Sequence, residues 1–140
     1  NIVGMDEALK MAYTNLESDK KHVSDLKTYF ISALKSNLPD VNFNGGCEDA
    51  ANSTYTLVNV CLPIAPEKAA MLQFQLDLKG VACSKGSACQ SGSSQQSHVL
   101  TAILDKKYLD RPSVRFSFSI FNTKDELDYV VSVLKEFANS

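Results

Sequence analysis

The sequence predicts an α+β fold in which helices pack on one side of a small, mostly antiparallel sheet. Segments at both ends of the chain show the apolar spacing of amphipathic helices, whereas short apolar or alternating segments between them are typical of strands. The chain has 140 residues, of which 44% are hydrophobic, and this size is common for one domain with a core of its own. We find no internal repeat, so one compact unit is expected.

One long helix is predicted at the N-terminus. From Met5 to Ala33, apolar residues recur at steps of four and three, and only Asp19 interrupts the pattern. At 1.5 Å per residue this helix would reach about 50 Å, which exceeds what a domain of this size needs across its own core. It is therefore expected either to form a coiled coil or to cross a larger body. The charged residues along it are expected to form its solvated face: Glu17, Asp19, Lys20, Lys21, Asp25 and Lys27.

The middle of the chain is predicted to hold three strands and a second helix. Leu38-Pro39 ends the first helix, because the residue before a proline disfavours helical backbone. The stretches VNFNGG (41–46), YTLVNVCLP (55–63) and GVACS (80–84) predict a short strand with a turn, a buried strand and a brief strand. A helix through EKAAMLQFQLDLK (67–79) precedes the last of these, since Pro66 suits its first turn and Gly80 its end.

The C-terminal part is predicted to form a short helix, a half-buried strand and a closing helix. SHVLTAIL (97–104) indicates the short helix. In PSVRFSFSIF (112–121) apolar and polar residues alternate, which is typical of a strand with one buried face. Thr123 and Glu126 form a capping box before the closing helix. The residues expected to face the core are Val114, Phe116, Phe118 and Ile120 from the strand and Leu127, Val130, Val131 and Leu134 from the helix.

Charge, hydropathy and cysteine spacing argue against several classes of protein. A formal charge of -2 gives no attraction to nucleic acid or to an acidic membrane surface. No apolar run approaches the roughly 20 residues needed to span a bilayer, and no leader-like segment is recognised, so a cytoplasmic protein is expected. The four cysteines lack paired C-x-x-C spacing and only two histidines accompany them. Neither a metal site nor a disulfide framework is therefore expected.

The stretch CSKGSACQSGSSQQS (83–97) is too polar and too rich in small residues to hold a core, yet it carries two of the cysteines. Cys89 lies among small residues, so its sulfur is expected to be exposed and able to move, although an exposed loop cysteine is often incidental. Arg115 lies on the polar face of the last strand, where an arginine is either solvated or positioned to bind a carboxylate. Cys61, inside an apolar run, is expected to be buried and inert.

Several of these stretches together resemble a known family. GSACQSG followed by SHVLTAI, and then SVRFSFSIFNTKDELDYVVSVLKE, are similar to the C-terminal part of the cysteine desulfurases, pyridoxal-phosphate enzymes of the aminotransferase class V family. NIVGMDEALKMA resembles the start of the long helix that leads from the cofactor domain of these enzymes into their small domain. The resemblance implies that Cys89 forms a persulfide and that Arg115 binds the substrate carboxylate. Cys83 is expected to be a bystander.

The resemblance also implies how the chain is organised. Residues 1–140 would form the C-terminal small domain of a larger enzyme, with 1–38 as the connecting helix and 39–140 as the sheet, the cysteine loop and the closing helix. The Ser-x-x-His-Lys type motif that holds the cofactor in this family is absent, as is a Gly-Thr stretch near the cofactor phosphate, and the chain begins at Asn1. We therefore expect that the cofactor domain is missing, that no cofactor is bound covalently and that the chain alone is inactive.

For the intact protein, the resemblance implies that L-cysteine is converted to L-alanine with pyridoxal 5'-phosphate as cofactor. The sulfur would pass through Cys89 to an acceptor protein such as an iron-sulfur cluster scaffold, and the enzyme would be a homodimer. Selenocysteine lyase and cysteine sulfinate desulfinase activities share the scaffold, and Ser119-Ile120 stand where many relatives have Gly-Arg, which leaves the subgroup open. The non-enzymatic alternative is an interaction module with a coiled-coil arm over residues 5–34.

Overall fold

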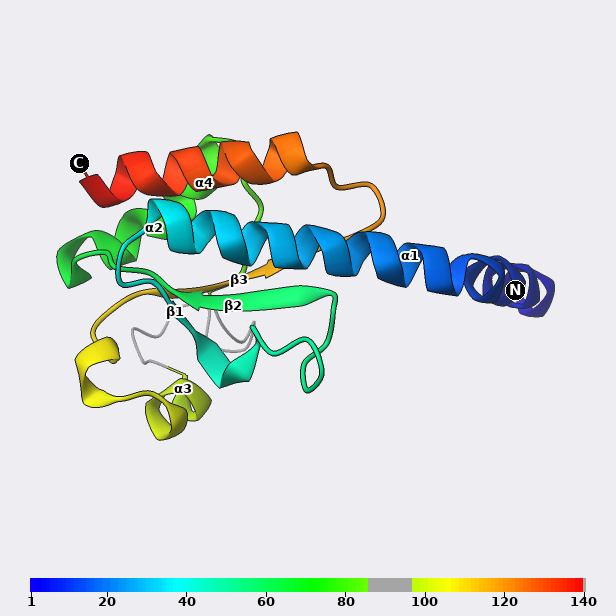
Figure 1. Ribbon diagram of the computed structural model, residues 1–140, viewed down its shortest axis with the longest axis horizontal. Helices are drawn as coiled ribbons and strands as arrows, with labels where there is room; N and C mark the ends of the chain where they lie inside the picture. Colours follow the sequence, from blue (N-terminus) through cyan, green and yellow to red (C-terminus); the bar gives the residue numbers. More distant parts are fainter. Residues whose placement is uncertain (86–96, 140) are drawn as a thin grey trace.

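The computed structural model describes residues 1–85 and 97–139. Four α-helices and three strands are arranged in these two ranges, with two short 3-10 turns between them (Figure 1). No helix among the described residues is long and apolar enough to cross a membrane. In chain order the elements are α1 (Ile2–Asn37), β1 (Asn42–Phe43), η1 (Asn44–Gly46), β2 (Leu57–Cys61), α2 (Pro66–Leu78), α3 (His98–Ile103), η3 (Lys106–Tyr108), β3 (Ser113–Ser117) and α4 (Lys124–Asn139).

The sheet is antiparallel and has the strand order β1-β2-β3. The central strand β2 pairs with β3 along its whole length, from Leu57 opposite Ser117 to Cys61 opposite Ser113. The brief strand expected over residues 80–84 is reduced to a single bridge between Ser84 and Arg115 at the outer edge of β3. Gly80, with a φ of +76°, ends α2 as expected. The residues that follow it form no strand pairing before Ser84.

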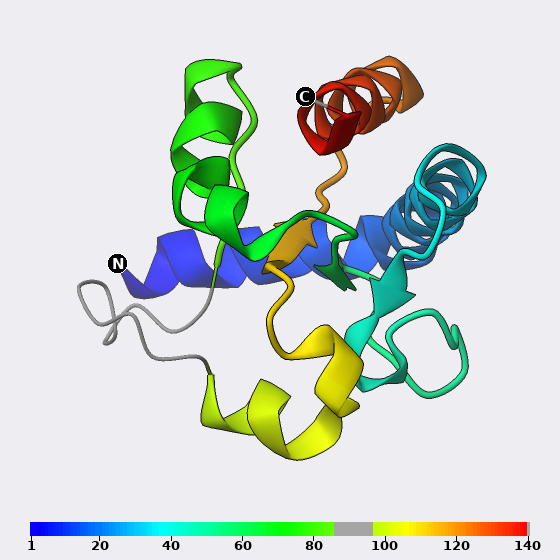
Figure 2. The same cartoon turned by 90° about the vertical axis from the view of Figure 1, so that its left-hand side faces the viewer.

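Three helices form a layer on one face of the sheet. Figures 1 and 2 show α1, α2 and α4 on this side, whereas the short α3 and η3 lie on the opposite side. The α1 and α4 helices pack against each other over the sheet. The predicted α+β class, with a long N-terminal helix and a small antiparallel sheet, is therefore confirmed.

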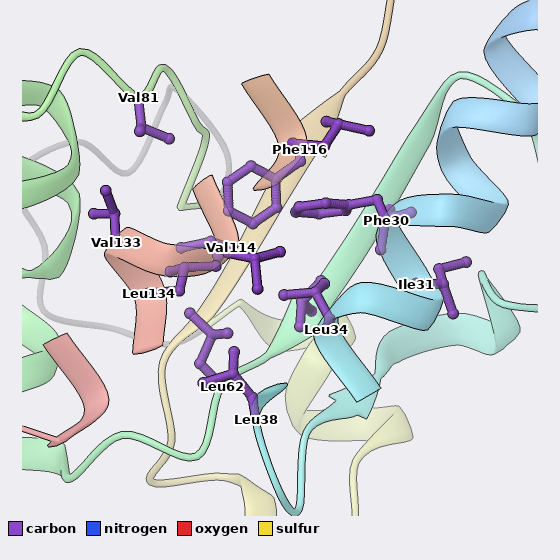
Figure 3. Packing of buried hydrophobic residues seen from close by; sticks show 14 of the residues in the cluster. Phe30, Ile31, Leu34, Leu38, Leu62, Val81, Val114, Phe116, Val133 and Leu134 are labelled. Carbon is purple, nitrogen blue, oxygen red and sulfur yellow. The ribbon is translucent and has the colours of Figure 1, made fainter. Parts of the chain in front are cut away.

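The core lies between the helix layer and the sheet. Phe30 of α1 is fully buried and meets the rings of Phe116 and Phe118 edge to face, with centroid distances of 5.2 and 5.6 Å. Figure 3 shows Phe30 beside Phe116. Edge-to-face pairs of this kind add to the stability gained from burying the rings. Other side chains with no more than 1% exposure surround them: Leu34, Val58, Val60, Leu62, Leu72, Leu76, Val114 and Leu134.

The two halves of α1 differ in their surroundings. Apolar residues of the C-terminal half are buried in the core, whereas in the N-terminal half Met5 remains 70% exposed and Leu9 55% exposed. Figure 1 shows this N-terminal half projecting beyond the sheet. The predicted apolar stripe therefore continues past the core of the described residues. Its exposed members are Met5, Leu9, Ala12 and Leu16, and its buried members are Val23, Leu26 and Phe30.

Lys27 corrects the prediction that the charged residues of α1 form a solvated face. Its side chain is only 4% exposed, and Nζ donates hydrogen bonds to Ser53 Oγ at 2.7 Å and to the Thr54 carbonyl at 2.8 Å. These oxygens replace water around the side-chain nitrogen, which is how a buried polar group is tolerated. Lys27 thus ties α1 to the loop between η1 and β2.

The start of α4 is built as the sequence predicts. The Thr123 backbone N–H donates to Glu126 Oε2 at 2.9 Å, and the Glu126 backbone N–H donates to Thr123 Oγ1 at 3.3 Å. These reciprocal bonds satisfy two donors at the helix start and lower the pKa of Glu126, because the backbone donor at Thr123 favours its charged form. The capping box is confirmed.

The alternating pattern before α4 ends earlier than predicted. Strand β3 stops at Ser117, and Ile120, expected in the core, is 46% exposed. The reason is a tight turn in which the Asn122 backbone N–H donates to the Ser119 carbonyl at 3.2 Å, while Asn122 Oδ1 accepts from the Ser119 backbone N–H at 2.8 Å. The turn takes Ile120 out of the pleat, so strand alternation no longer applies to it.

Candidate active site

Alternation along β2 and β3 divides their side chains between two faces. Val58 and Val60 of β2 point into the core, and Figure 3 shows Val114 and Phe116 of β3 pointing toward Phe30. The intervening residues lie on the other face, away from the helix layer. We call this the polar face of the sheet. Its polar members are Asn59, Ser113, Arg115 and Ser117, and Leu57 and Cys61 of β2 lie on the same face.

Arg115 lies in the middle of β3 on this polar face, and its side chain is exposed. Its backbone N–H donates to the Ser84 carbonyl at 2.7 Å, and its carbonyl accepts from the Ser84 N–H at 3.0 Å. Among the described residues, the guanidinium group has no ion pair. A fixed backbone with an exposed guanidinium can bind a planar anion through two parallel hydrogen bonds.

Residues 83–85 are bonded to α2 as well as to β3. Gln73 Nε2 donates to the Cys83 carbonyl at 3.4 Å, and Lys85 Nζ donates to the Ala69 carbonyl at 3.2 Å. The segment that leads into the cysteine stretch is therefore held on two sides. Cys89 itself lies outside the described residues.

The three described cysteines lie in settings that favour the neutral thiol or bury it. Burial raises the pKa of Cys61, with a smaller opposing effect of a hydrogen bond from Ser113, and burial with nearby Asp77 raises the pKa of Cys83. Because the thiolate is the nucleophile, a raised pKa makes these two thiols unreactive at neutral pH. The expectation that Cys61 is buried and inert agrees with this setting.

Asn59 and Asn44 join the polar face, although the sequence pattern did not single them out. Asn59 is the direct partner of Arg115 in the β2–β3 register, and its Oδ1 accepts a hydrogen bond of 2.9 Å from Asn44 Nδ2. Asn44 Nδ2 also donates to Ser113 Oγ at 3.0 Å. An asparagine at the centre of the apolar run LVNVC was the available signal, because a buried-strand position favours apolar residues.

The described residues do not by themselves fit pyridoxal phosphate or a metal. Lys27 is the buried lysine of residues 1–85 and 97–139, and its Nζ is bonded to Ser53 and Thr54 rather than presented to the polar face. Within the same ranges, no group of three or more His, Cys, Asp or Glu side chains could hold a metal ion. The polar face offers an anion-binding arginine and amide groups, but neither a lysine for an imine nor an acid for a pyridine nitrogen is shown there.

Known proteins resemble this chain in sequence and in fold. A cysteine desulfurase IscS from Dictyoglomus turgidum is 33% identical over 134 residues, which are 96% of this chain and 33% of that protein. A cysteine desulfurase from Rattus norvegicus is 35% identical over 130 residues, which are 93% of this chain and 27% of that protein. The solved structure of a NifS-like protein superposes with a TM-score of 0.72 at 24% identity, covering 99% of this chain and 33% of that one.

The structural likeness supports the fold, and the sequence likeness extends over almost the whole chain. This chain spans between 27% and 33% of the length of these relatives. The family model described as aminotransferase class-V matches residues 1–130. The chain therefore belongs to the aminotransferase class-V family.

Proposed function

We propose that this chain is the C-terminal small domain of a larger pyridoxal-phosphate enzyme, with residues 1–38 as the connecting helix and 39–140 as the body. The exposed apolar half of α1 supports this, because an uncovered apolar stripe marks a surface that packs against something else. The relatives' additional length could supply that partner. In this proposal a cofactor domain, upstream in sequence, covers the stripe in the intact homodimeric enzyme.

The reaction we propose is desulfuration of L-cysteine. The carbon–sulfur bond of the substrate breaks, a sulfur–sulfur bond forms at Cys89, and L-alanine leaves after its β-carbon gains a proton. Pyridoxal phosphate supplies the electron sink for this bond cleavage when it is bound by the intact enzyme. Since the described residues lack a group for an imine, we expect this chain alone to bind no cofactor covalently and to release no sulfide.

Arg115 is proposed to bind the substrate carboxylate. Its exposed guanidinium provides parallel donors that match the two oxygens of a carboxylate. The observation that carries the proposal is the pair of backbone bonds between Arg115 and Ser84. Cys89 follows Ser84 by five residues, and an extended chain spans at most about 3.6 Å per residue. The covalent chain thus keeps the proposed sulfur acceptor within reach of the proposed carboxylate site.

From Cys89 the sulfur is proposed to pass to an acceptor protein, such as an iron-sulfur cluster scaffold, in the cytoplasm. A thiol that must collect sulfur from a bound substrate and then present it to a second protein cannot be fixed in one place. The composition of residues 86–96, rich in Gly, Ser and Gln, suits both tasks.

The test uses the full-length protein with Cys89→Ala and, as a matched control, Cys83→Ala. With L-cysteine and a thiol reductant, the wild type is expected to form alanine and sulfide in equal amounts. Cys89→Ala should lose nearly all turnover, whereas Cys83→Ala should keep it, because burial already holds that thiol neutral. Full activity of Cys89→Ala would remove this residue from the reaction.

A comparison of substrates tests whether the enzyme is a cysteine desulfurase, a selenocysteine lyase or a cysteine sulfinate desulfinase. Wild-type turnover is expected to be highest with L-cysteine. Faster release of selenide from selenocysteine, or of sulfite from cysteine sulfinate, together with an active Cys89→Ala variant, would assign the enzyme to one of those related activities instead.

A further inference from the structure

The side chain of Asn59 stands next to that of Arg115 across the sheet. The two residues are direct partners in the β2–β3 register. The Arg115 backbone N–H and carbonyl both point away from β2, because they bond to Ser84 at 2.7 and 3.0 Å. The pair is therefore of the non-hydrogen-bonded type, in which facing Cβ atoms lie about 4.5–5.5 Å apart. The register thus places Asn59 beside the base of the Arg115 side chain.

Hydrogen bonds hold Asn59 at both its backbone and its side chain. Cys47 Sγ donates to the Asn59 carbonyl at 3.3 Å and accepts from the Asn59 N–H at 3.4 Å, which continues the β1 edge after Phe43. Asn59 Oδ1 accepts from Asn44 Nδ2 at 2.9 Å, and the same nitrogen donates to Ser113 Oγ at 3.0 Å. The Asn59 amide is therefore held by Asn44 of η1, which is itself bonded to Ser113 of β3.

Burial of Asn44 sets the direction of this amide network. Asn44 is 4% exposed, and its Oδ1 is buried without a hydrogen-bond partner among the described residues. Turning the Asn44 amide over would leave two buried N–H donors unpaired in place of one acceptor, and each unpaired group costs free energy. In the observed orientation Asn44 Nδ2 donates its hydrogen bond to Asn59 Oδ1. The Asn59 amide nitrogen, a donor, is consequently turned away from Asn44.

These contacts bear on how Arg115 is presented. An arginine side chain has several rotatable bonds, and a two-point grip on a carboxylate requires its planar head in one orientation. The Asn59 side chain is uncharged and its Oδ1 already accepts from Asn44, so it attracts the guanidinium far less than a carboxylate at this position would. Arg115 is exposed, and an uncharged neighbour held in place by Asn44 does not draw its cation toward the sheet.

We propose that Asn59, held by Asn44, is a positioning residue that directs Arg115 for binding of the substrate carboxylate. This inference rests on the proposed function, because it takes Arg115 as the carboxylate-binding group. Asn59 acts through Arg115 and does not itself contact substrate. The hydrogen-bonded cluster of Asn44, Asn59 and Ser113 then supports the active site without contacting the substrate.

The first test is Asn59→Asp in the full-length protein. This change keeps an oxygen for Asn44 Nδ2 but places a negative charge beside Arg115. The introduced carboxylate pairs with the guanidinium and competes with substrate, so KM for L-cysteine is expected to rise roughly tenfold while kcat stays within about twofold. A merely structural role of Asn59 would not separate KM from kcat in this way. An unchanged KM overturns the proposal.

Asn42→Asp is the matched control. Asn42 is the partner of Cys61 in β1, so it lies on the same face of the sheet, and strand geometry places it about 12 Å from Arg115. The same chemical change at this distance is expected to leave KM within about twofold of the wild type. An equal rise in KM for both variants would mean that charge on this face, and not the position beside Arg115, causes the effect.

Crystal structures of the full-length wild type and Asn59→Ala separate this inference from the proposed function. Wild-type turnover of L-cysteine tests the function, whereas the Arg115 conformation tests the positioning without reference to activity. We expect the guanidinium in one position in the wild type and spread over several in Asn59→Ala. If the Arg115 guanidinium takes the same single position in both structures, the positioning role is overturned even if the enzyme desulfurates cysteine. If the guanidinium takes several positions in Asn59→Ala but the wild type does not turn over cysteine, the positioning role is supported and the proposed function is not.

Discussion

The two halves of α1 carry the same apolar spacing and have different surroundings. In residues 21–37 the stripe is buried, with Phe30 at 0% exposure, whereas in residues 2–20 the side chains of Ile2 and Met5 are 79% and 70% exposed. An apolar period shows which side of a helix is to be covered, but it does not show what covers it. The difference indicates that one half of the helix belongs to the core of this chain and that the other half is available to another body.

The largest effect is expected for Phe30→Ala in the buried half. The change removes a ring that meets both Phe116 and Phe118 and leaves a cavity between α1 and β3. The free energy of unfolding should fall by about 3–5 kcal/mol. Denaturant titration of the variant gives this value. Tyr13→Ala, in the exposed half, is the control and should change it by less than about 0.5 kcal/mol. Equal losses would mean that both halves are packed.

A smaller effect is expected for Lys27→Met, which tests the polar contact in the buried half. Methionine preserves much of the side-chain volume but cannot donate to Ser53 and the Thr54 carbonyl. The Thr54 carbonyl would then lose its partner, at a cost of about 1–3 kcal/mol in the free energy of unfolding. Lys10→Met, in the exposed half, removes only a surface ion pair with Asp6 and should cost less than about 1 kcal/mol. A stabilised Lys27→Met variant would show that burying this nitrogen is a net cost.

The smallest effect within this chain is expected for Leu9→Gln in the exposed half. Leu9 is already 55% exposed, so the free energy of unfolding of the 140-residue chain should change by less than about 0.5 kcal/mol. In the full-length protein the same change should destabilise by about 1–3 kcal/mol, because it would place a polar group in the interface with the proposed cofactor domain. Thermal unfolding of both forms makes the comparison. Equal small effects would contradict a covering domain over this half.

At the candidate site, too, the sequence pattern predicted some features correctly and others wrongly. Alternation in β3 placed Arg115 opposite the core and correctly separated it from Val114 and Phe116. It failed at Ile120, because the hydrogen bonds between Ser119 and Asn122 turn the chain and end the strand. Cys89 stays a prediction from the sequence.

The sequence by itself determined the local features of this protein. The long helix, the capping box at Thr123, the end of α2 at Gly80 and the exposed position of Arg115 depend on spacing and on residues close in the chain. Tertiary structure decided the burial of Lys27, the covering of only one half of α1 and the placing of Asn59 beside Arg115. The physical reason is that these depend on strand register and on packing between residues far apart in sequence, and no local pattern encodes which partner a face will meet.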